Sequence, residues 1–429
     1  MWNAENETAR RNRSRETSTC KTLRNWLVMG KHGMITNILK SVINANENHN
    51  KRIMETKTFE NLNLKDNLVK NIYLYGYVKP SKIQIKGIEA INKMKDCLLQ
   101  SQSGTGKTAT YLLGILNRID NKKKFTQGLV ILPTRELAEQ VYNVAQVIGK
   151  EYNIQLCTGG HKNNYKLVKS AQLVIGTIGK LTWLIEKNIL ILNKLNLIVL
   201  DEADELFKND FNYKLKNIFK ILPSNIQTIF ISATVNYNIN KFSKKLLNDP
   251  IKILLKKNQV AVDLISQFFI DAEDETNKFS VLMDIYNIVQ SSQCIIFCNT
   301  IRKIKWLEEN LKKENFPITT IHGNMTQDER KEIVKDFRDG KTRILLTSDL
   351  LARGIDIPSV KLVINYDLPI NKETYMHRIG RCGRFDKKGI SISIVKSNDP
   401  QDNKIFNTMK RFYSLKIKEF DPEYVNKCL

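Results

Sequence analysis

The sequence predicts an α/β protein with two tandem domains, each a parallel β-sheet flanked by helices. Three observations lead to this fold class. Short, almost continuously apolar runs of strand length alternate with longer helical patterns, as expected for strands that helices cover on both faces. The alternation breaks once, near residues 248–250, and then resumes. The chain of 429 residues is also long enough for two or three domains.

The apolar runs of the first half are predicted to be the strands of one sheet. They lie at residues 97–100, 128–132, 172–175, 197–200 and 227–231. The segments between them predict helices at residues 107–119, 136–148 and 213–221. The second half repeats the alternation, with strands predicted at residues 294–297, 319–322, 343–347, 361–365 and 390–394.

The domain boundaries follow from these patterns. We predict a first domain at residues 59–248, a linker at 249–262 and a second domain at 263–429. Residues 1–58 are polar and Asn-rich, with eleven Lys or Arg against five Asp or Glu, and they are expected to form a basic, flexible extension. A basic arm that touches RNA and an organellar transit peptide are the alternatives, and the glutamates of this segment argue against the second.

Composition narrows the class of partner. Lys and Arg outnumber Asp and Glu by 68 to 44, a net charge of +24, which favours a polyanion such as nucleic acid. The chain is rich in Asn, Ile and Lys, and a compositional bias toward these residues would also raise the net charge without any functional cause. The net charge alone therefore does not distinguish nucleic-acid binding from such a bias. No run of 18 apolar residues occurs, so no membrane span is predicted. The seven scattered cysteines fit a reducing compartment.

Residues 101–108 read Ser-Gln-Ser-Gly-Thr-Gly-Lys-Thr, between a predicted strand and a predicted helix. Glycines let the backbone wrap around an anion, and the helix N-terminus adds a favourable potential. The lysine supplies a charge for the β- and γ-phosphates, and the threonine supplies an oxygen for Mg²⁺. Only the first Ser departs from the usual Gly or Ala. The residues expected to bind the phosphates are Ser101, Gln102, Ser103, Gly104, Thr105, Gly106, Lys107 and Thr108.

Residues 201–204 read Asp-Glu-Ala-Asp and follow another predicted strand. Asp201 is placed to hold Mg²⁺, largely through water, together with Thr108. Glu202 is placed to orient and deprotonate the attacking water. Alone, the four residues could be an acidic helix start. Their position 93 residues (201 − 108) after the phosphate loop favours a nucleoside triphosphatase instead.

Further motifs follow in a fixed order. They lie at residues 59, 76–84, 133–138, 159–160, 176–180 and 232–234, and then at 296–302, 322–323, 327–330, 347–349, 353–356 and 377–384. In this order, over residues 59–429, the chain resembles the DEAD-box helicases of superfamily 2. The resemblance implies two tandem RecA-like domains with the active site in the cleft between them. It also implies an RNA-stimulated ATPase that unwinds short RNA duplexes.

The resemblance implies which residues complete the ATP site. Gln84 would bind the adenine edge, and Tyr77 would pack against the base together with Phe59. These contacts to adenine imply ATP as the nucleotide that is hydrolysed. The alternative for both aromatic rings is core packing. Arg381 and Arg384 would reach the γ-phosphate across the cleft and act with Lys107 and Glu202 in catalysis. Asp356 would approach the ribose, with Gly354 beside it.

The RNA site implied by the resemblance contacts backbone rather than base edges. One motif departs from the pattern, because Ile178 stands in the place of a proline and Lys180 in the place of an arginine. Lysine keeps the positive charge of arginine but lacks its planar guanidinium group, which can donate two parallel hydrogen bonds. The sequence therefore does not settle how strongly this motif contacts RNA. The residues expected to bind RNA are Pro133, Thr134, Arg135, Gly160, Thr177, Arg302, Gly323, Gln327, Arg330 and Thr347.

Within the family, the chain is most similar to translation initiation factor 4A and its nuclear exon-junction paralogue. Residues 349–356 are closer to the first and residues 296–300 to the second. We expect a cytoplasmic monomer that binds ATP and single-stranded RNA cooperatively, acts in translation initiation and meets protein regulators on both domains. The alternative is a nuclear helicase or an ATP-dependent RNA clamp in mRNA processing or ribosome biogenesis. Intact Lys107, Glu202 and Arg381 argue against an inactive binding protein.

Overall fold

The structure is a computed structural model of the whole chain. It describes residues 57–101, 104–255, 264–288, 293–349, 360–383, 388–413 and 415–428. Phe59–Leu429 forms one compact unit. Almost all of the predicted extension at residues 1–58 lies outside the described residues, as do residues 256–262 of the predicted linker. Among the described residues, none of the helices is both long enough and apolar enough to span a bilayer.

The first sheet has seven strands in the order β3-β4-β2-β5-β6-β1-β7, and all neighbouring strands are parallel. Its central strands are buried along their whole length, which explains their continuous apolar runs. The strands are β1 (Cys97–Gln100), β2 (Gly128–Leu132), β3 (Ile154–Cys157), β4 (Leu173–Thr177), β5 (Leu197–Leu200), β6 (Gln227–Ser232) and β7 (Ile251–Ile253).

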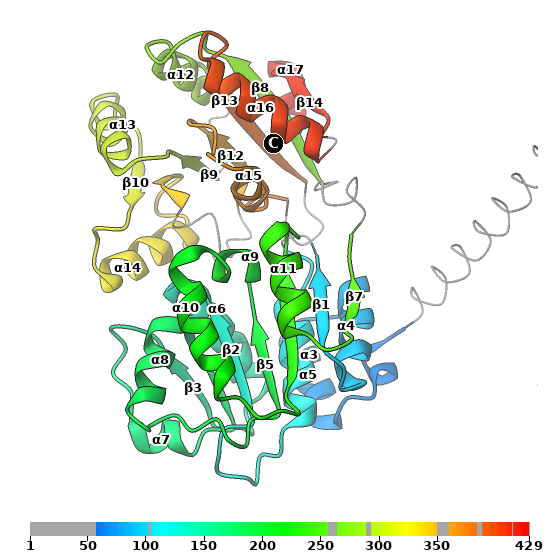
Figure 1. Cartoon of the computed structure of the whole chain (residues 1–429). Coiled ribbons are helices and arrows are strands. Elements are labelled where there is room, and N and C mark those ends of the chain that lie inside the picture. Colours follow the sequence, from blue (N-terminus) through cyan, green and yellow to red (C-terminus); the bar gives the residue numbers. More distant parts are fainter. Residues whose placement is uncertain are drawn as a thin grey trace, which may run out of the picture. The chain divides into compact units, whose positions relative to one another are not determined.

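The second sheet has the order β10-β11-β9-β12-β13-β8-β14, again with parallel neighbours. This is the order of the first sheet with seven added to each label, so the two halves share one topology (Figure 1). The predicted α/β fold with two parallel sheets is confirmed. The strands are β8 (Ile265–Asp271), β9 (Gln293–Phe297), β10 (Ile318–Ile321), β11 (Ile344–Thr347), β12 (Val360–Asn365), β13 (Gly389–Val395) and β14 (Ile417–Glu419).

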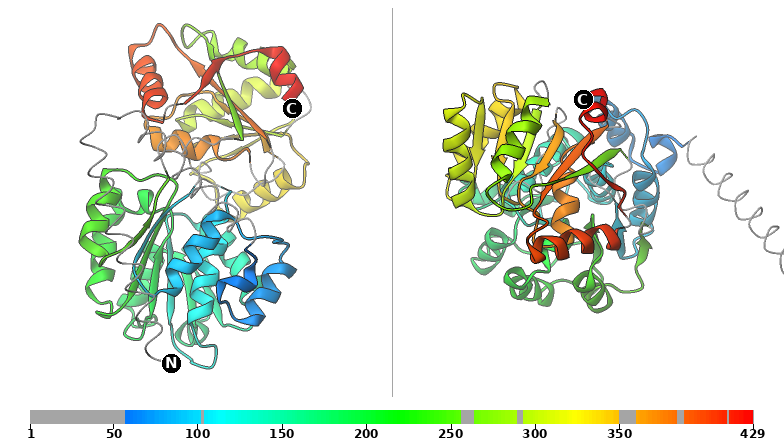
Figure 2. Two further views of the ribbon diagram at one scale, coloured as in Figure 1. Left: turned by 90° about the vertical axis from the view of Figure 1, so that its right-hand side faces the viewer. Right: turned by 90° about the horizontal axis from the view of Figure 1, so that it is seen from above.

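Helices cover both faces of the first sheet (Figure 2). One face carries α8 to α11, whose apolar side chains form a continuous core with β2, β4, β5 and β6. The other carries α3 to α6. The elements are η1 (Phe59–Leu62), α3 (Asp66–Leu74), α4 (Lys82–Asn92), α5 (Lys107–Arg118), α6 (Arg135–Ile148), α7 (Tyr165–Lys169), α8 (Ile178–Glu186), α9 (Ala203–Leu206), α10 (Asn209–Lys220) and α11 (Tyr237–Leu246).

The second sheet is covered in the same way. Core residues of α12, α13 and α17 pack on one face, and those of α14, α15 and α16 pack on the other. Side-chain caps at the first turns of α13, α14, α15 and α16 explain why these helices begin where they do. The helices are α12 (Lys278–Ile288), α13 (Ile301–Lys313), α14 (Gln327–Arg338), α15 (Lys372–Ile379), α16 (Pro400–Phe412) and α17 (Pro422–Cys428).

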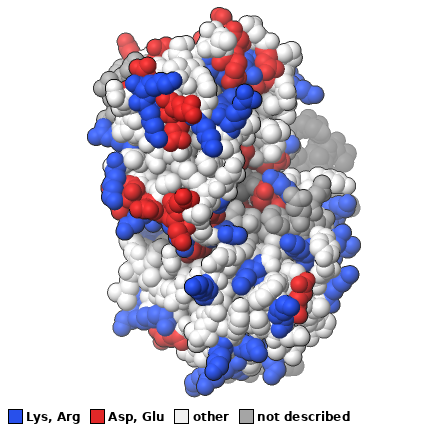
Figure 3. Space-filling view, turned by 90° about the vertical axis from the view of Figure 1, so that its left-hand side faces the viewer, with Lys and Arg blue, Asp and Glu red and all other residues white. Residues whose placement is uncertain are grey.

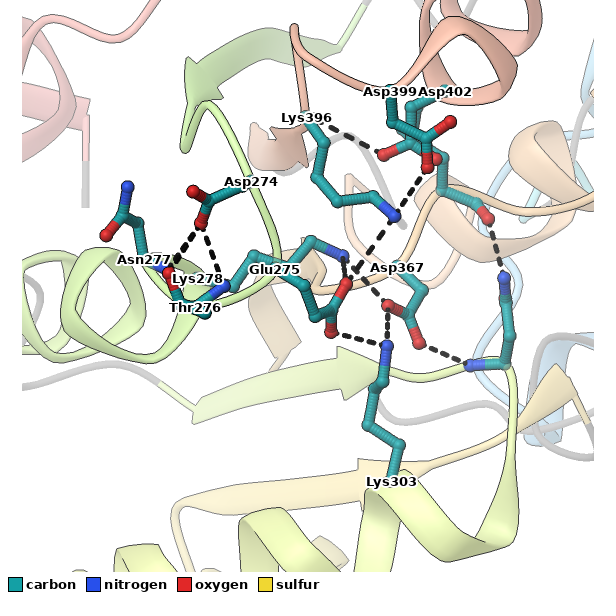
Figure 4. Close-up of polar contacts among 12 residues, drawn as sticks. Asp274, Glu275, Thr276, Asn277, Lys278, Lys303, Asp367, Lys396, Asp399 and Asp402 are labelled. Atoms are coloured by element: carbon teal, nitrogen blue, oxygen red, sulfur yellow. Dashed lines mark hydrogen bonds and ion pairs between the residues drawn. The ribbon is translucent and has the colours of Figure 1, made fainter.

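A buried ion cluster lies just after β12, at the carboxyl edge of the second sheet (Figure 4). Asp367 Oδ1 lies 2.9 Å from the ammonium of Lys278 and 2.8 Å from that of Lys303, while Oδ2 accepts a hydrogen bond from Asn299 N. Lys278 is only 1% exposed. Arg378 of α15 donates to the Asp367 carbonyl and to the Asn299 side chain. The cluster therefore joins α12, α13 and α15 to the sheet edge.

Charge and burial act on Asp367 in opposite directions. Burial alone would raise the pKa of this carboxyl, but Lys278, the Asn299 amide and Lys303 together lower the pKa below its ordinary value. A carboxylate with a lowered pKa stabilises the folded state above its unfolded pKa, about 4. This contribution is lost as the pH falls through the folded-state pKa.

We expect Asp367→Asn to lower the free energy of unfolding of the second domain by up to about 3–5 kcal/mol at neutral pH, because it removes the nearer carboxylate of buried Lys278 and leaves only the half-exposed Glu275, 3.5 Å away. Urea unfolding followed by circular dichroism measures this. The difference from wild type should begin to shrink as the pH falls below about 4, the unfolded-state pKa, and should disappear once the pH is below the lowered folded-state pKa of Asp367. Asp249→Asn is the control, because Asp249 pairs with Lys95 on the exposed surface and its loss should change little. Equal effects of the two substitutions would contradict the assignment.

Candidate nucleotide and RNA sites

The phosphate loop joins β1 to α5. Gly104 and Gly106 both have left-handed backbone angles, with φ of 76° and 93°, and Gly106 is the N-cap of α5. The Lys107 ammonium donates to the carbonyl of Ser101 at 3.1 Å, and the hydroxyl of Ser101 lies 2.6 Å from that of Thr105. The serine that departs from the usual pattern is therefore accommodated by a hydrogen bond across the loop. Gln102 and Ser103 lie outside the described residues.

Gln84 lies against this loop. Its side chain and that of Ser81 form a capping box at the start of α4, and the Ser81 hydroxyl donates to the carbonyl of Thr105 at 2.8 Å. A Cβ on Gly106 would come within 2.5 Å of Gln84 Nε2, so a glycine is needed there. Among the described residues, this buried amide nitrogen has no hydrogen-bond partner. A buried free donor beside the phosphate loop suits an acceptor nitrogen of a purine base.

The two aromatic residues predicted beside the base differ in exposure. Phe59 is completely buried and packs edge-on against Tyr73 and Tyr77, with ring centroids 5.7 Å and 6.4 Å away. Tyr77 is partly exposed and also stacks on Tyr75. Phe59 is thus a core residue in this structure, and Tyr77 is the ring with surface left for a ligand.

The acidic motif lies at the carboxyl end of β5. Asp201 accepts hydrogen bonds from Tyr111 Oη and from the amide of Glu202, both at 2.8 Å. Burial and then the neighbouring Glu202 raise the pKa of Asp201, while Lys107 opposes the rise. A buried carboxylate pair of this kind favours a cation. Asp201 and Thr108, at the second position of α5, are therefore suited to hold Mg²⁺.

Asp204 lies two residues beyond Glu202, on α9, and it is 1% exposed. Its two carboxylate oxygens accept from the hydroxyls of Ser232, which ends β6, and Thr234, two residues further on, both at 2.9 Å. Nε2 of His377, on α15 of the second domain, lies 2.8 Å from Asp204 Oδ2. One buried carboxylate thus connects the acidic motif, the segment after β6 and the second domain. The segment after β6 also meets β1, because the amide of Ser101 donates to the carbonyl of Ser232.

Arg381 follows α15 and is buried, and its Nε donates to the carbonyl of His377 at 3.1 Å. This places Arg381 one helical turn beyond the histidine that contacts Asp204. The structure therefore brings α15, which Arg381 follows, to the motif that contains Glu202. Gly354, Asp356 and Arg384 lie outside the described residues, so their predicted roles stay predictions.

The residues predicted to bind RNA meet at a second contact between the domains. Arg135, the first residue of α6, donates to the Gln327 side chain at 3.0 Å, and Gln327 is the first residue of α14. Gly159 lies so close to the Arg135 guanidinium that a Cβ there would be 2.8 Å from a nitrogen. Gly160, exposed and with φ of 82°, is beside the same two side chains.

Arg330 extends this contact. Its guanidinium lies 3.1 Å from Glu136 Oε1 and donates to the carbonyl of Gly323 at 2.6 Å. Lys331 of α14 lies 2.5 Å from Glu139 of α6. Two ion pairs therefore join α6 to α14 beside residues that were predicted to bind RNA.

The remaining predicted RNA contacts stand at element ends. Thr134 caps α6 by accepting from the amide of Leu137, and Pro133 precedes it after β2. Thr177 is the N-cap of α8, and Arg302 is exposed on α13. Thr347 ends β11 and is fully buried, and its hydroxyl donates to the carbonyl of Ser348.

Sequence reasoning did not identify three contacts of the site. Tyr111 has no motif to mark it, and it would be found only through its position one turn into α5. His377 lies in a motif, but its partner Asp204 is 173 residues away, and no local pattern links the two. The free amide of Gln84 beside Gly106 likewise depends on how the loop folds over α4.

Family models match both halves of the chain. Residues 81–242 match the DEAD/DEAH box helicase model, and residues 277–386 match the helicase conserved C-terminal domain. The chain is 43% identical to the ATP-dependent RNA helicase FAL1 of Kluyveromyces lactis, over 86% of this chain and 94% of that protein. It is 44% identical to the ATP-dependent RNA helicase eIF4A of Debaryomyces hansenii, over 84% and 92%.

Solved structures show the same arrangement of two domains. S. cerevisiae Dbp5 bound to RNA and ADP BeF3 has a TM-score of 0.82 and is 34% identical, over 87% of this chain and 98% of that chain. Mss116p bound to single-stranded RNA and AMP-PNP has a TM-score of 0.75 at 26% identity, over 86% and 79%. Since relatives match this chain along nearly their whole length, the chain belongs to the DEAD-box family of ATP-dependent RNA helicases, which are RNA-stimulated ATPases.

Proposed function

We propose that the protein binds ATP and single-stranded RNA cooperatively and separates short RNA duplexes locally. The observation that carries this proposal is the contact between Asp204 and His377, because the nucleotide motif of one domain thereby shares a buried carboxylate with the other. Neither domain alone holds both Glu202 and Arg381. A reaction that needs both groups needs closed domains.

RNA would favour the same closed arrangement. Arg135 of the first domain and Gln327 of the second lie within hydrogen-bond distance of each other, so one RNA strand across this contact would touch both domains. A ligand that binds the closed state more tightly than the open state shifts the population toward the closed state, and two such ligands assist each other. Contacts to the RNA backbone from both sides would hold a bent single strand and exclude a straight duplex. Hydrolysis of ATP would then let the two domains separate again.

Within the nucleotide site, Lys107 would bind the β- and γ-phosphates, while Gln84 would donate to the adenine. Thr108 and Asp201 would hold Mg²⁺, which when bound neutralises charge on the phosphates. Glu202 would orient the attacking water and take its proton. Glu202 has a left-handed backbone, with φ of 49°, at the N-cap of α9. Arg381 would stabilise the charge that develops on the γ-phosphate.

The cellular role we propose is translation initiation in the cytoplasm, as a monomer regulated by proteins that contact both domains. The eIF4A relative supports the role in translation initiation. The solved complex of Dbp5 with Nup159 and Gle1 supports regulation by proteins. The second candidate is an ATP-dependent RNA clamp in the nucleus or in ribosome biogenesis. FAL1 relatives at nearly the same identity favour this alternative.

Glu202→Gln should lower the RNA-stimulated ATPase kcat by about 10²–10⁴-fold, because glutamine cannot accept the proton of the attacking water. The affinity for ATP should change little. Steady-state phosphate release with saturating RNA measures kcat, and Glu205→Gln on the same short helix is the control, expected to keep the wild-type rate. Wild-type turnover in Glu202→Gln would show that another group is the base.

His377→Ala should weaken the cooperativity between the two ligands. In the wild type, a non-hydrolysable ATP analogue should raise the affinity for single-stranded RNA, and we expect the substitution to reduce that gain by about tenfold. The affinity for RNA without nucleotide should change little, because RNA then binds mostly to open domains, in which Asp204 and His377 are apart. Fluorescence anisotropy of a labelled oligonucleotide with and without the analogue measures both. An undiminished gain in a folded variant would exclude the Asp204 contact from the coupling.

The lifetime of the RNA complex separates the two cellular candidates. A helicase that cycles should release RNA within seconds in the presence of hydrolysable ATP, and it should separate a short labelled duplex. A clamp should hold RNA for minutes under the same conditions without any partner. Competitor chase of a fluorescent oligonucleotide from the full chain gives the dissociation rate, and the non-hydrolysable analogue supplies the reference for a closed complex that does not cycle.

A further inference from the structure

Lys180 and Trp183 lie one turn apart on α8, directly after the predicted RNA contact Thr177. The Lys180 ammonium lies 4.5 Å from the centroid of the Trp183 ring. Side chains three residues apart share one face of a helix, and an ammonium within about 6 Å of an indole face is attracted by the ring. The ring therefore restricts the positions of a side chain that is otherwise flexible.

The indole ring is itself supported. Tyr165, the first residue of α7, packs against Trp183 with centroids 6.2 Å apart and an angle of 46°. Tyr165 follows the Gly160 segment, so the ring pair connects two of the predicted RNA motifs. Both rings remain open to solvent, with Trp183 38% and Tyr165 44% exposed.

The surface around the ring pair is basic. Lys166 and Lys169 belong to α7, and the Lys214 ammonium would lie 3.9 Å from a Cβ on Gly179. In Figure 3, the lower part of the face carries more Lys and Arg than Asp and Glu, among uncharged surface. Lys180 forms no ion pair with any residue in the described part of the chain, so its charge is available to a ligand.

We propose that Trp183 is a positioning residue, which holds the Lys180 ammonium for a phosphate of the bound RNA. Family members commonly have an arginine at this point, whose planar fork is already rigid. A lysine has a longer flexible stem, and ordering it costs entropy on binding. The indole ring orders the ammonium before RNA binds. It thereby lowers the entropy cost that the exchange of a rigid guanidinium for a flexible lysine would otherwise add to binding. Ile178, the other departure, is buried in the core of the first domain, where it fixes the start of α8.

This inference rests on the proposed binding of single-stranded RNA. A double-mutant cycle with Lys180→Ala and Trp183→Ala tests it, using the full chain, a fluorescent oligouridylate and a non-hydrolysable ATP analogue over a range of salt concentrations. Lys180→Ala should reduce the slope of log affinity against log salt by about 0.7, the loss of one phosphate contact. Trp183→Ala should weaken binding about threefold in the wild-type background and not at all in the Lys180→Ala background.

Two further variants and a control complete the design. Trp183→Phe keeps the packing against Tyr165 with a weaker ring and should give an intermediate affinity. Lys180→Arg should restore the affinity lost in Trp183→Ala, because a guanidinium fork does not need the ring. Phe412→Ala is the matched control: Lys372 lies over that ring at 4.1 Å, the ring is 38% exposed, and RNA affinity should not change.

Other outcomes overturn the inference in distinguishable ways. A ring that stacks on a base would make Trp183→Ala weaken binding equally in both backgrounds, with an unchanged salt slope. A ring that serves a protein partner would leave RNA affinity unchanged in folded Trp183→Ala. If the wild type itself fails to bind the oligonucleotide, the proposed function fails with it.

Discussion

The buried carboxylate of Asp204 is the constraint on which the rest of the site depends. A charge removed from water must be compensated by hydrogen bonds, and here the three compensating groups come from two segments, at residues 232–234 and at residue 377. Ser232 and Thr234 bring the end of β6 to α9, and His377 brings α15 of the second domain. The carbonyl of Ser232 in turn accepts from the amide of Ser101, which begins the phosphate loop. Satisfying one carboxylate thus gathers the nucleotide motifs of both domains.

The parallel sheets make this gathering possible. Every strand of a parallel sheet ends at the same edge, so segments that follow strands collect there whatever their separation in sequence. In the first domain, the loop after β1, the acidic motif after β5 and the hydroxyls after β6 all meet in this way. The second sheet has the same strand order and presents Asn299 after β9 and Asp367 after β12 at its own edge.

The sequence predicted most of this frame, because strands buried on both faces need uninterrupted apolar side chains. It did not predict the strands β3, β7, β8 and β14, which lie at or next to sheet edges. β7, for example, is three residues long and only partly buried, and it lies within the segment predicted as a linker. An edge strand has one exposed side, so it lacks the apolar run that marks a central strand.

The site was predicted as a set of motifs but not as a set of contacts. Motifs identify residue types that suit phosphates, water and RNA, and the phosphate loop lies where its pattern placed it. The partners of Asp204, the free amide of Gln84 and the ring over Lys180 depend on tertiary approach. The departure at Lys180 illustrates the difference: the sequence showed that an arginine was replaced, while only the structure showed an indole ring one turn away.

Two of the buried carboxylates, Asp204 and Asp367, are compensated differently, and the difference fits the place of each in the fold. Asp367 pairs with two lysine ammonium groups, and separating such a buried pair costs about 3–5 kcal/mol. Asp204 is held by two hydroxyls of its own domain and by His377 of the other. When His377 leaves, Asp204 keeps two of these donors, and the loss is nearer the 1–3 kcal/mol of one hydrogen bond. In the proposed cycle, the contact that breaks each time the domains open is of the second kind, while the contact that holds the strand edge is of the first.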